Sequence, residues 1–152
     1  MQIRLDDLAG GEVIALLREH LADMYATSPP ESVHALDVEG LKASNIRFFS
    51  AWQGETLAGC VAIKTLDSEL AELKSMRTAS AFRGMGVGQA LLQYIIDHAK
   101  VQGFITLSLE TGTQDYFAPA RALYRKFGFT DCGPFGQYKP DLNSHFMTLK
   151  LR

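Results

Sequence analysis

A glycine-rich turn is the part of this sequence whose residue spacing points most directly to chemistry. Residues 83–88 read Arg-Gly-Met-Gly-Val-Gly and lead into a segment in which apolar residues have helical spacing. Glycines at alternate positions let the backbone approach a ligand without a Cβ atom in the way, and free N–H groups at a helix N-terminus attract negative charge. The turn is therefore predicted to cradle a phosphate group, although a tight strand-to-helix connection also needs glycine for geometric reasons alone.

Two better-known phosphate cradles do not fit this turn. A Rossmann fingerprint begun at Gly84 or Gly86 needs glycine at position 89 or 91, where the chain has Gln89 and Leu91. A Walker loop needs Gly-Lys followed by Ser or Thr, whereas Gln and Ala follow Gly88. Dinucleotide binding and ATP hydrolysis are therefore disfavoured.

The segments around the turn alternate between helical and extended patterns. Apolar residues at three- and four-residue intervals predict an amphipathic helix over 12–27, which Pro29 and Pro30 end. Aromatic and β-branched residues predict a hairpin over 47–66. We further expect a short helix at 38–41, strands at 71–78, 104–110, from 129 and at 145–151, and helices at 89–101 and 118–127. This order predicts an α/β (α+β) fold on a mixed, mostly antiparallel sheet.

Length and composition fit one soluble globular domain spanning residues 1–152. The chain has 47% hydrophobic and 21% charged residues, no apolar run of the ~18 residues that span a membrane, and an acidic start unlike a signal peptide. A net charge of −2 disfavours nucleic acid as a partner. Two cysteines without CxxC spacing and four scattered histidines predict neither a disulfide framework nor a metal site. We therefore expect a cytoplasmic protein with no metal and no membrane partner.

The turn and its surroundings resemble the GNAT superfamily of N-acetyltransferases. In motif A of that family, Arg or Gln is followed after two residues by Gly and after one more by Gly or Ala, which Arg83, Gly86 and Gly88 satisfy. Leu-Glu-Thr-Gly at 109–112 and Ala-Leu-Tyr-Arg-Lys-Phe-Gly-Phe at 122–129 are similar to forms common in small bacterial-type members. The resemblance covers nearly the whole chain and implies about seven strands, about four helices and splayed parallel strands in the middle.

The resemblance implies acetyl-CoA as co-substrate and an amine as acceptor. Backbone N–H groups of the turn would receive the pyrophosphate, and Arg83 with one of Arg121, Arg125 or Lys126 would meet the remaining phosphate charge. The pantetheine arm would bond between the strands at 73–78 and 105–110, where an N–H group near Met76 polarises the thioester oxygen. The expected cofactor-binding residues are Met76, Arg77, Thr78, Arg83, Gly84, Met85, Gly86, Val87, Gly88, Gln89, Arg121 and Tyr124.

Three side chains are candidates for the proton transfers that acetyl transfer needs. By the resemblance, Tyr124, near the start of the last helix, would protonate the departing thiolate, unless it is a core tyrosine. Glu72 and Glu110 are rival candidates for the base that prepares the amine, and each also fits a strand-end carboxylate in water or in an ion pair. Glu72 would reach the acceptor if it shares a strand face with Lys74 and Met76.

The route of transfer and the acceptor are less well marked in the sequence. Neither Cys60 nor Cys132 has a neighbouring cation or base to activate its thiol, which favours direct transfer in a ternary complex over an acyl-cysteine route. The acceptor is expected at the irregular segments 28–36 and 135–143, whose residues do not identify it. A catalytically silent acyl-CoA-binding module and a domain with no CoA site stay open as alternatives, and the resemblance makes a homodimer possible.

Overall fold

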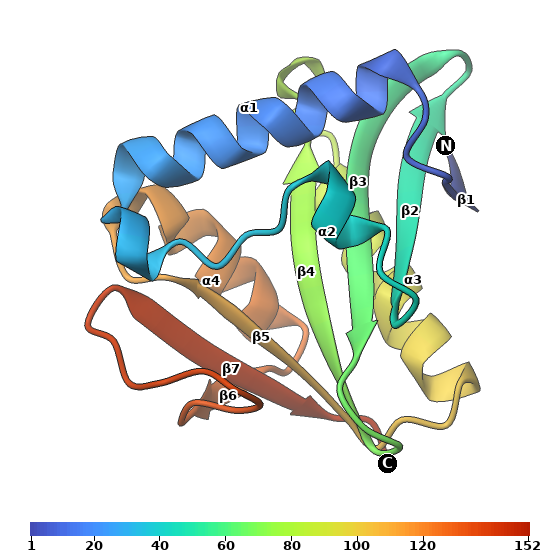
Figure 1. Cartoon of the computed structure of the whole chain (residues 1–152). Coiled ribbons are helices and arrows are strands. Elements are labelled where there is room, and N and C mark those ends of the chain that lie inside the picture. Colours follow the sequence, from blue (N-terminus) through green and yellow to red (C-terminus); the bar gives the residue numbers. More distant parts are fainter.

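A single seven-stranded sheet forms the centre of the computed structural model, which describes residues 1–152 (Figure 1). The strands lie in the order β1-β2-β3-β4-β5-β7-β6. Their bounds are β1 Gln2–Leu5, β2 Ile46–Gln53, β3 Thr56–Thr65, β4 Leu70–Thr78, β5 Thr106–Gly112, β6 Thr130–Cys132 and β7 Ser144–Lys150. Every neighbouring pair is antiparallel except β4 and β5, which run parallel. The prediction of a mixed, mostly antiparallel sheet is confirmed.

The parallel strands β4 and β5 stay paired over a short stretch only. Their ladder ends at the pair Glu72 and Ser108, although β4 continues to Thr78 and β5 to Gly112. Beyond that pair, β4 remains bonded to β3, and β5 remains bonded to β7. The two strands therefore diverge towards their carboxyl ends, as Figure 1 shows, which confirms the expected splayed pair.

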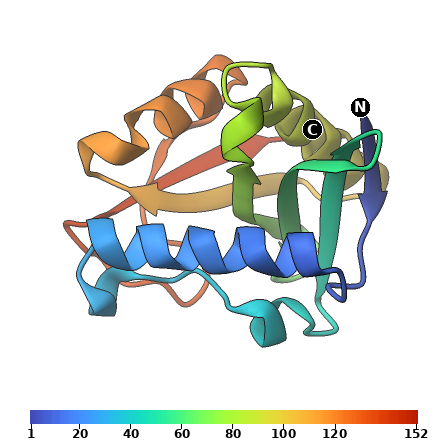
Figure 2. The ribbon, with the colours of Figure 1, turned by 90° about the horizontal axis from the view of Figure 1, so that it is seen from above.

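Helices cover both faces of the sheet. Figure 2 shows α1 (Gly11–Thr27) and the short α2 (Val38–Leu41) on one face, and α3 (Val87–Val101) and α4 (Ala118–Lys126) on the other. Short 3-10 turns at Pro30–Ser32, Ser80–Phe82 and Asp115–Phe117 join these elements. None of the helices is both long enough and apolar enough to cross a membrane.

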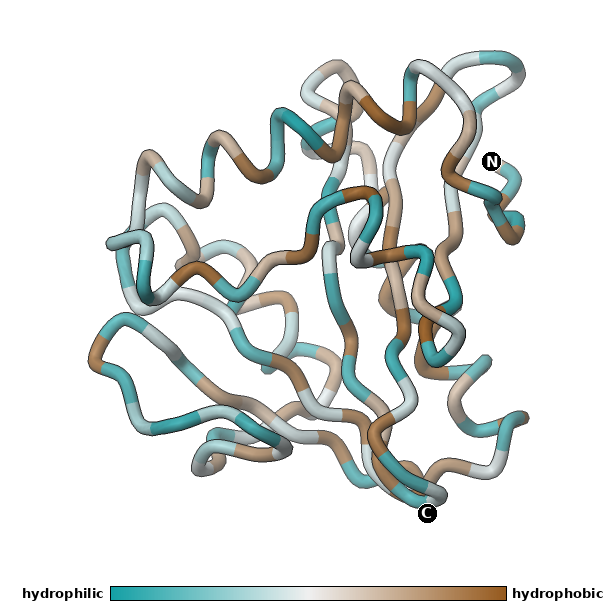
Figure 3. Tube along the Cα trace, in the orientation of Figure 1, coloured by the Kyte–Doolittle hydropathy of each residue, from teal (hydrophilic) through white to brown (hydrophobic).

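The apolar side chains form two clusters, one on each face of the sheet. The larger cluster packs Leu91 and Ile95 of α3 against strand residues such as Leu107. The smaller cluster packs Leu17 of α1 against Trp52 of β2. Figure 3 shows hydrophobic and hydrophilic residues alternating along α1, as expected for a helix with one face on the sheet. Burial of both sheet faces holds the diverging strands in place from two sides.

Three elements differ from the sequence expectations, among them β5, which lies two residues later than the strand expected at 104–110. The patterns do not predict β1, because a four-residue edge strand of mixed polarity gives no clear alternation; it pairs with β2 from Gln2 opposite Trp52. The helix expected to begin at residue 89 begins at Val87, because Gly86 just before it takes a left-handed conformation with φ of +81°. The first helical N–H groups therefore lie inside the glycine-rich turn.

Candidate active site

A bulge in β4 determines where the side chains of that strand point. Cys60 lies opposite Arg77, and Ala62 lies opposite Lys74, so β4 carries one more residue than β3 across this stretch. Ser75, within the bulge, has a left-handed backbone with φ of +53°. Its carbonyl accepts a hydrogen bond from the thiol of Cys60 at 3.4 Å. The bulge lies where β4 has already parted from β5.

This bulge corrects one expectation about the strand. Glu72 and Lys74 bond to each other on the face away from α3 and α4, whereas Met76 packs against the larger core cluster under those helices. The condition under which Glu72 was expected to reach the acceptor, a face shared with Lys74 and Met76, is therefore not met. The extra residue at Ser75 shifts the alternation, so Met76 falls on the opposite face from Glu72.

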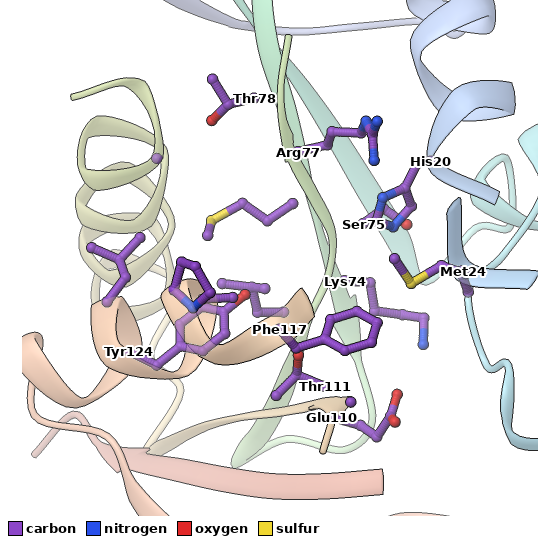
Figure 4. A pocket seen from close by; sticks show the side chains of 18 of the residues that line it. His20, Met24, Lys74, Ser75, Arg77, Thr78, Glu110, Thr111, Phe117 and Tyr124 are labelled. Atoms are coloured by element: carbon purple, nitrogen blue, oxygen red, sulfur yellow. The ribbon is translucent and has the colours of Figure 1, made fainter. Parts of the chain in front are cut away.

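The divergence of β4 and β5 opens a cleft with a volume of about 720 Å³. Its walls come from α1, β4, the start of α3, the end of β5 and α4. In Figure 4, Thr78 lies at one end, Tyr124 lies on the side of α4, and His20 and Met24 lie on the side of α1. A cavity of this size with a few polar groups among apolar ones is typical of a small-molecule site.

The glycine-rich turn forms one end of the cleft. No side chain caps α3, so the N–H groups of Val87, Gly88 and Gln89 have no intrahelical partner. A Cβ atom at Gly88 would lie 3.3 Å from Leu123 Cδ2, which shows how closely α4 approaches the turn. The N–H of Met85 is already bonded to Phe82, and that of Ala90 to Gly86. The turn therefore offers fewer free N–H groups to a phosphate than the sequence suggested, because those of Met85 and Ala90 are already bonded.

The basic side chains expected near the phosphates have different positions. Arg83 is exposed and lines the cleft. Arg121 does not line it, because its guanidinium donates to the carbonyls of Gly112 at 2.7 Å and Gln114 at 3.1 Å. Arg125 forms an ion pair with Asp131 at 2.9 Å and also lies outside the cleft, as Lys126 does. Of the four, Arg83 is the one placed to meet a bound anion.

Arg77 reaches α1 instead of the turn. Its buried side chain forms ion pairs with Glu19 and with Asp23, the latter at 2.6 Å, and this pairing lowers the pKa of Asp23. The side chain is therefore not available to the phosphates. Met76, Arg77 and Thr78 nevertheless all line the cleft along this strand.

Glu110 and Tyr124 approach the cleft from β5 and α4. Burial raises the pKa of Glu110 to about 7, and the nearby Ser144 and the charge of Lys74 partly oppose this shift. Burial also raises the pKa of Tyr124, and the neighbouring Glu110 raises it further. Tyr124 lies in the last turn of α4, not near its start as expected, because the helix is only nine residues long and ends at Lys126. It is nevertheless both a core residue and a lining residue of the cleft.

Glu72 is engaged with two other side chains. Its carboxylate accepts hydrogen bonds from Lys74 Nζ at 3.2 Å and from the hydroxyl of Tyr138. Only 4% of its side chain is exposed. Glu110 has no such ion-pair partner and its pKa lies near neutrality, so the surroundings favour Glu110 over Glu72 as a base.

The two irregular segments expected to hold the acceptor do meet. The hydroxyl of Ser32 donates to Asp141 at 2.7 Å, and the ring of His34 packs edge-on against Tyr138 with centroids 5.1 Å apart. His20 also lines this end; burial and the charge of Arg77 lower its pKa to about 4, so the ring is neutral.

Sequence reasoning missed several residues of this end. His20 lies on the helical stripe of α1, and its spacing gives no sign that the ring borders a cleft. Ser75 is missed because nothing in its residue type indicates a left-handed conformation. Tyr138 lies in a segment expected near the acceptor, but its bonds to Glu72 and Lys74 join positions more than sixty residues apart. Such long-range pairs leave no local pattern.

Comparison with known proteins assigns the family. Residues 13–129 match the model of the acetyltransferase (GNAT) family. The chain is 51% identical over 151 residues to the uncharacterized N-acetyltransferase YsnE of Bacillus subtilis, covering 99% of this chain and 100% of that protein. It is 44% identical over 142 residues to the IAA acetyltransferase of Azospirillum brasilense, covering 92% of this chain and 89% of that protein. The chain belongs to the GNAT family and is an acetyltransferase.

Solved structures share the same fold. An acetyltransferase of Bacillus subtilis in complex with CoA matches with a TM-score of 0.72 at 20% sequence identity, covering 98% of this chain and 97% of that one. An acetyltransferase of Staphylococcus aureus matches with a TM-score of 0.73 at 21% identity, covering 99% and 100%. The predicted family and fold are both confirmed.

Proposed function

We propose that the protein transfers the acetyl group of acetyl-CoA directly to a primary amine of a small molecule or peptide. The observation that carries this proposal is the cleft between β4 and β5, which joins the helix N-terminus of α3 at one end to Glu110 and Tyr124 further along. The family supplies the reaction type, and the CoA bound to the similar Bacillus subtilis structure agrees with a CoA site in this fold.

The residues of the cleft fit CoA. The N–H groups of Val87, Gly88 and Gln89 have no side-chain cap and no intrahelical acceptor, and would receive the pyrophosphate, with Arg83 lining the same end. Gly84 and Gly86 hold left-handed conformations, with φ of +75° and +81°, that keep the turn open. Beyond Glu72, the edge of β4 that faces β5 has no strand partner, and a pantetheine arm would bond there like an added strand.

The side chains further along the cleft supply the proton transfers. Bound acetyl-CoA offers a thioester carbonyl, which a neutral amine can attack. Glu110, with a pKa near 7, takes the proton that the amine must lose. Tyr124 is protonated at neutral pH, since even the ordinary pKa of tyrosine is 10 and burial raises it, and it gives that proton to the departing sulfur. Backbone N–H groups at the bulge around Met76 stabilise the charge that develops on the carbonyl oxygen.

Direct transfer agrees with the state of the cysteines. Burial raises the pKa of Cys60 to about 12, so its thiol carries its proton at neutral pH. Burial and the nearby Asp131 also raise the pKa of Cys132. A covalent acyl-cysteine route would need a thiolate. An amine that attacks the thioester itself needs none.

The test is a screen for release of free thiol from acetyl-CoA over a broad amine library. IAA, the compound in the name of the Azospirillum brasilense relative, is assayed separately beside this library. We expect acetyl-CoA to raise the melting temperature, and at least one primary amine to release thiol and gain an acetyl group. Thermal stabilisation with no acetylated amine would favour a silent acyl-CoA-binding module, and no stabilisation at all would contradict the CoA site.

A further inference from the structure

A second cavity lies next to the cleft. Its volume is about 740 Å³, and most of its lining residues are polar or charged. They come from residues 31–45, from the end of β3, its connection to β4 and β4 itself, and from residues 133–143, the β6–β7 loop. Lys64, Lys139 and Asp141 are among its charged residues. The cleft and this second cavity share four lining residues, which we call the partition: His34, Glu72, Lys74 and Tyr138.

Tyr138 is held at both ends within the partition. Its hydroxyl donates to Glu72 and accepts from Lys74 Nζ at 3.1 Å. Its ring packs edge-on against His34, with centroids 5.1 Å apart. Phe135 and Phe146 pack against the same ring, with centroid distances of 5.1 and 5.4 Å. The ring therefore has one defined position between the two cavities.

The other charged members of the partition would stay in place without Tyr138. Glu72 and Lys74 lie on β4, bond to each other at 3.2 Å, and have side chains only 4% and 8% exposed. Tyr138 instead comes from the β6–β7 loop and is only partly buried. Removing its ring would therefore open the partition while leaving the ion pair intact.

We propose that Tyr138 limits the length of the acceptor by closing the cleft off from the second cavity. This inference rests on the proposed function, since it assumes that the acceptor amine enters the end of the cleft near Glu110. An acceptor with a long chain on the side away from its amine must either displace Tyr138 or leave that chain outside the cleft. Three acidic and three basic residues are among those that line the second cavity, so its charges balance, and a polar chain without net charge fits at that far end.

The test compares acceptors of increasing length. One series of probes consists of methoxy-oligo(ethylene glycol) amines, from 2-methoxyethylamine upward. A second series consists of the best amine of the screen with the same oligo(ethylene glycol) chains attached at a position remote from its amine. The wild type, Tyr138→Ala and the matched control Tyr138→Phe are assayed for kcat/KM by thiol release. We expect kcat/KM of the wild type to fall with chain length, and Tyr138→Ala to raise kcat/KM for long relative to short probes by roughly fivefold.

The control separates the ring from its hydroxyl. Tyr138→Phe keeps the ring and should retain the wild-type dependence on length, whatever it does to the overall rate. His34→Ala removes the other member of the partition that lies in a loop. It should shift the dependence of kcat/KM on probe length in the same direction as Tyr138→Ala, and it replaces Tyr138→Ala in the test if that variant does not fold. Equal length dependence in all variants, or an equal shift in Tyr138→Phe and Tyr138→Ala, would overturn the proposal. If acetyl-CoA stabilises the wild type but the wild type acetylates no probe and no library amine, the proposed function is contradicted, and this inference with it.

Discussion

Glu72 and Glu110 show how surroundings assign different chemistry to the same residue type. Both are carboxylates close to the point where β4 and β5 part, and the sequence alone leaves them as rivals. Glu72 is paired with Lys74 and bonded by Tyr138, whereas Glu110 is partly buried with a pKa near 7. A base must be free to accept a proton at working pH, which Glu110 satisfies.

Replacing Glu110 tests this assignment through pH dependence. The wild-type kcat/KM should fall about tenfold per pH unit below the pKa of about 7, because the protonated carboxyl cannot act as a base. Glu110→Gln should no longer show this fall at low pH, and its kcat/KM should be about 100-fold lower than that of the wild type. Glu55→Gln, at the exposed hairpin turn, is the control and should match the wild type. A wild-type pH limb that persists in Glu110→Gln would exclude Glu110 as the base.

The same substitution has a predictable effect on stability. The folded pKa of Glu110 lies above its ordinary value of 4.5, so the folded state binds the proton more tightly than the unfolded state. The stability from this proton is complete below about pH 4.5 and is lost as pH rises through about 7. Glu110→Gln should therefore be more stable than the wild type by about 1 to 2 kcal/mol near pH 8, with a smaller difference near pH 5.

Tyr124 carries the second proton transfer in the proposed mechanism. Tyr124→Phe keeps the ring that packs against Phe129, so folding and acetyl-CoA affinity should be preserved. Turnover should fall about tenfold or more, because the thiolate then leaves without a positioned acid. Steady-state kinetics with the best amine measures this, and Tyr94→Phe, on α3 outside the cleft, is the matched control. Unchanged kcat in Tyr124→Phe would remove Tyr124 from the mechanism.

At the scale of elements, the sequence indicated the cradle but not the bulge. Three glycines before an apolar helical pattern are a local signal, and the structure places them at the start of α3. The bulge at Ser75 is set by the pairing of β4 with β3, including the bond from Cys60, and no local pattern encodes it. This is why strict alternation failed for Met76. For the same reason, β1 can be recognised as a strand only from its pairing with β2.

A substitution in the cradle tests its role in binding. A Cβ atom at Gly88 would lie 3.3 Å from Leu123 Cδ2 and 3.8 Å from Thr78 Oγ1, so Gly88→Val would fill the space where α3 begins. We expect acetyl-CoA affinity to fall by roughly tenfold or more, about 1.4 kcal/mol, with a cooperative unfolding transition retained. Titration calorimetry measures the affinity. Gly133→Val is the control, because a Cβ atom there meets nothing within 4 Å; equal affinity in both variants would contradict the cradle.

At the scale of the whole molecule, the order of elements was predictable and the acceptor was not. The hydrophobic periodicity of α1 and α3 and the hairpin of β2 and β3 reappear in the two core clusters. The acceptor end is assembled from α1, the turn at Pro30–Ser32, β4 and the β6–β7 loop, through pairs such as Ser32 with Asp141 and Glu72 with Tyr138. Residues so distant in sequence become neighbours only when the sheet forms, so their joint chemistry cannot be read in advance.

A crystal structure of the protein grown with coenzyme A tests the central claim most directly. The account predicts the diphosphate on the N–H groups of Val87, Gly88 and Gln89, and the pantetheine arm between β4 and β5 with its sulfur near Tyr124. Coenzyme A bound elsewhere on the molecule, or side chains of the protein filling the space before α3, would contradict it.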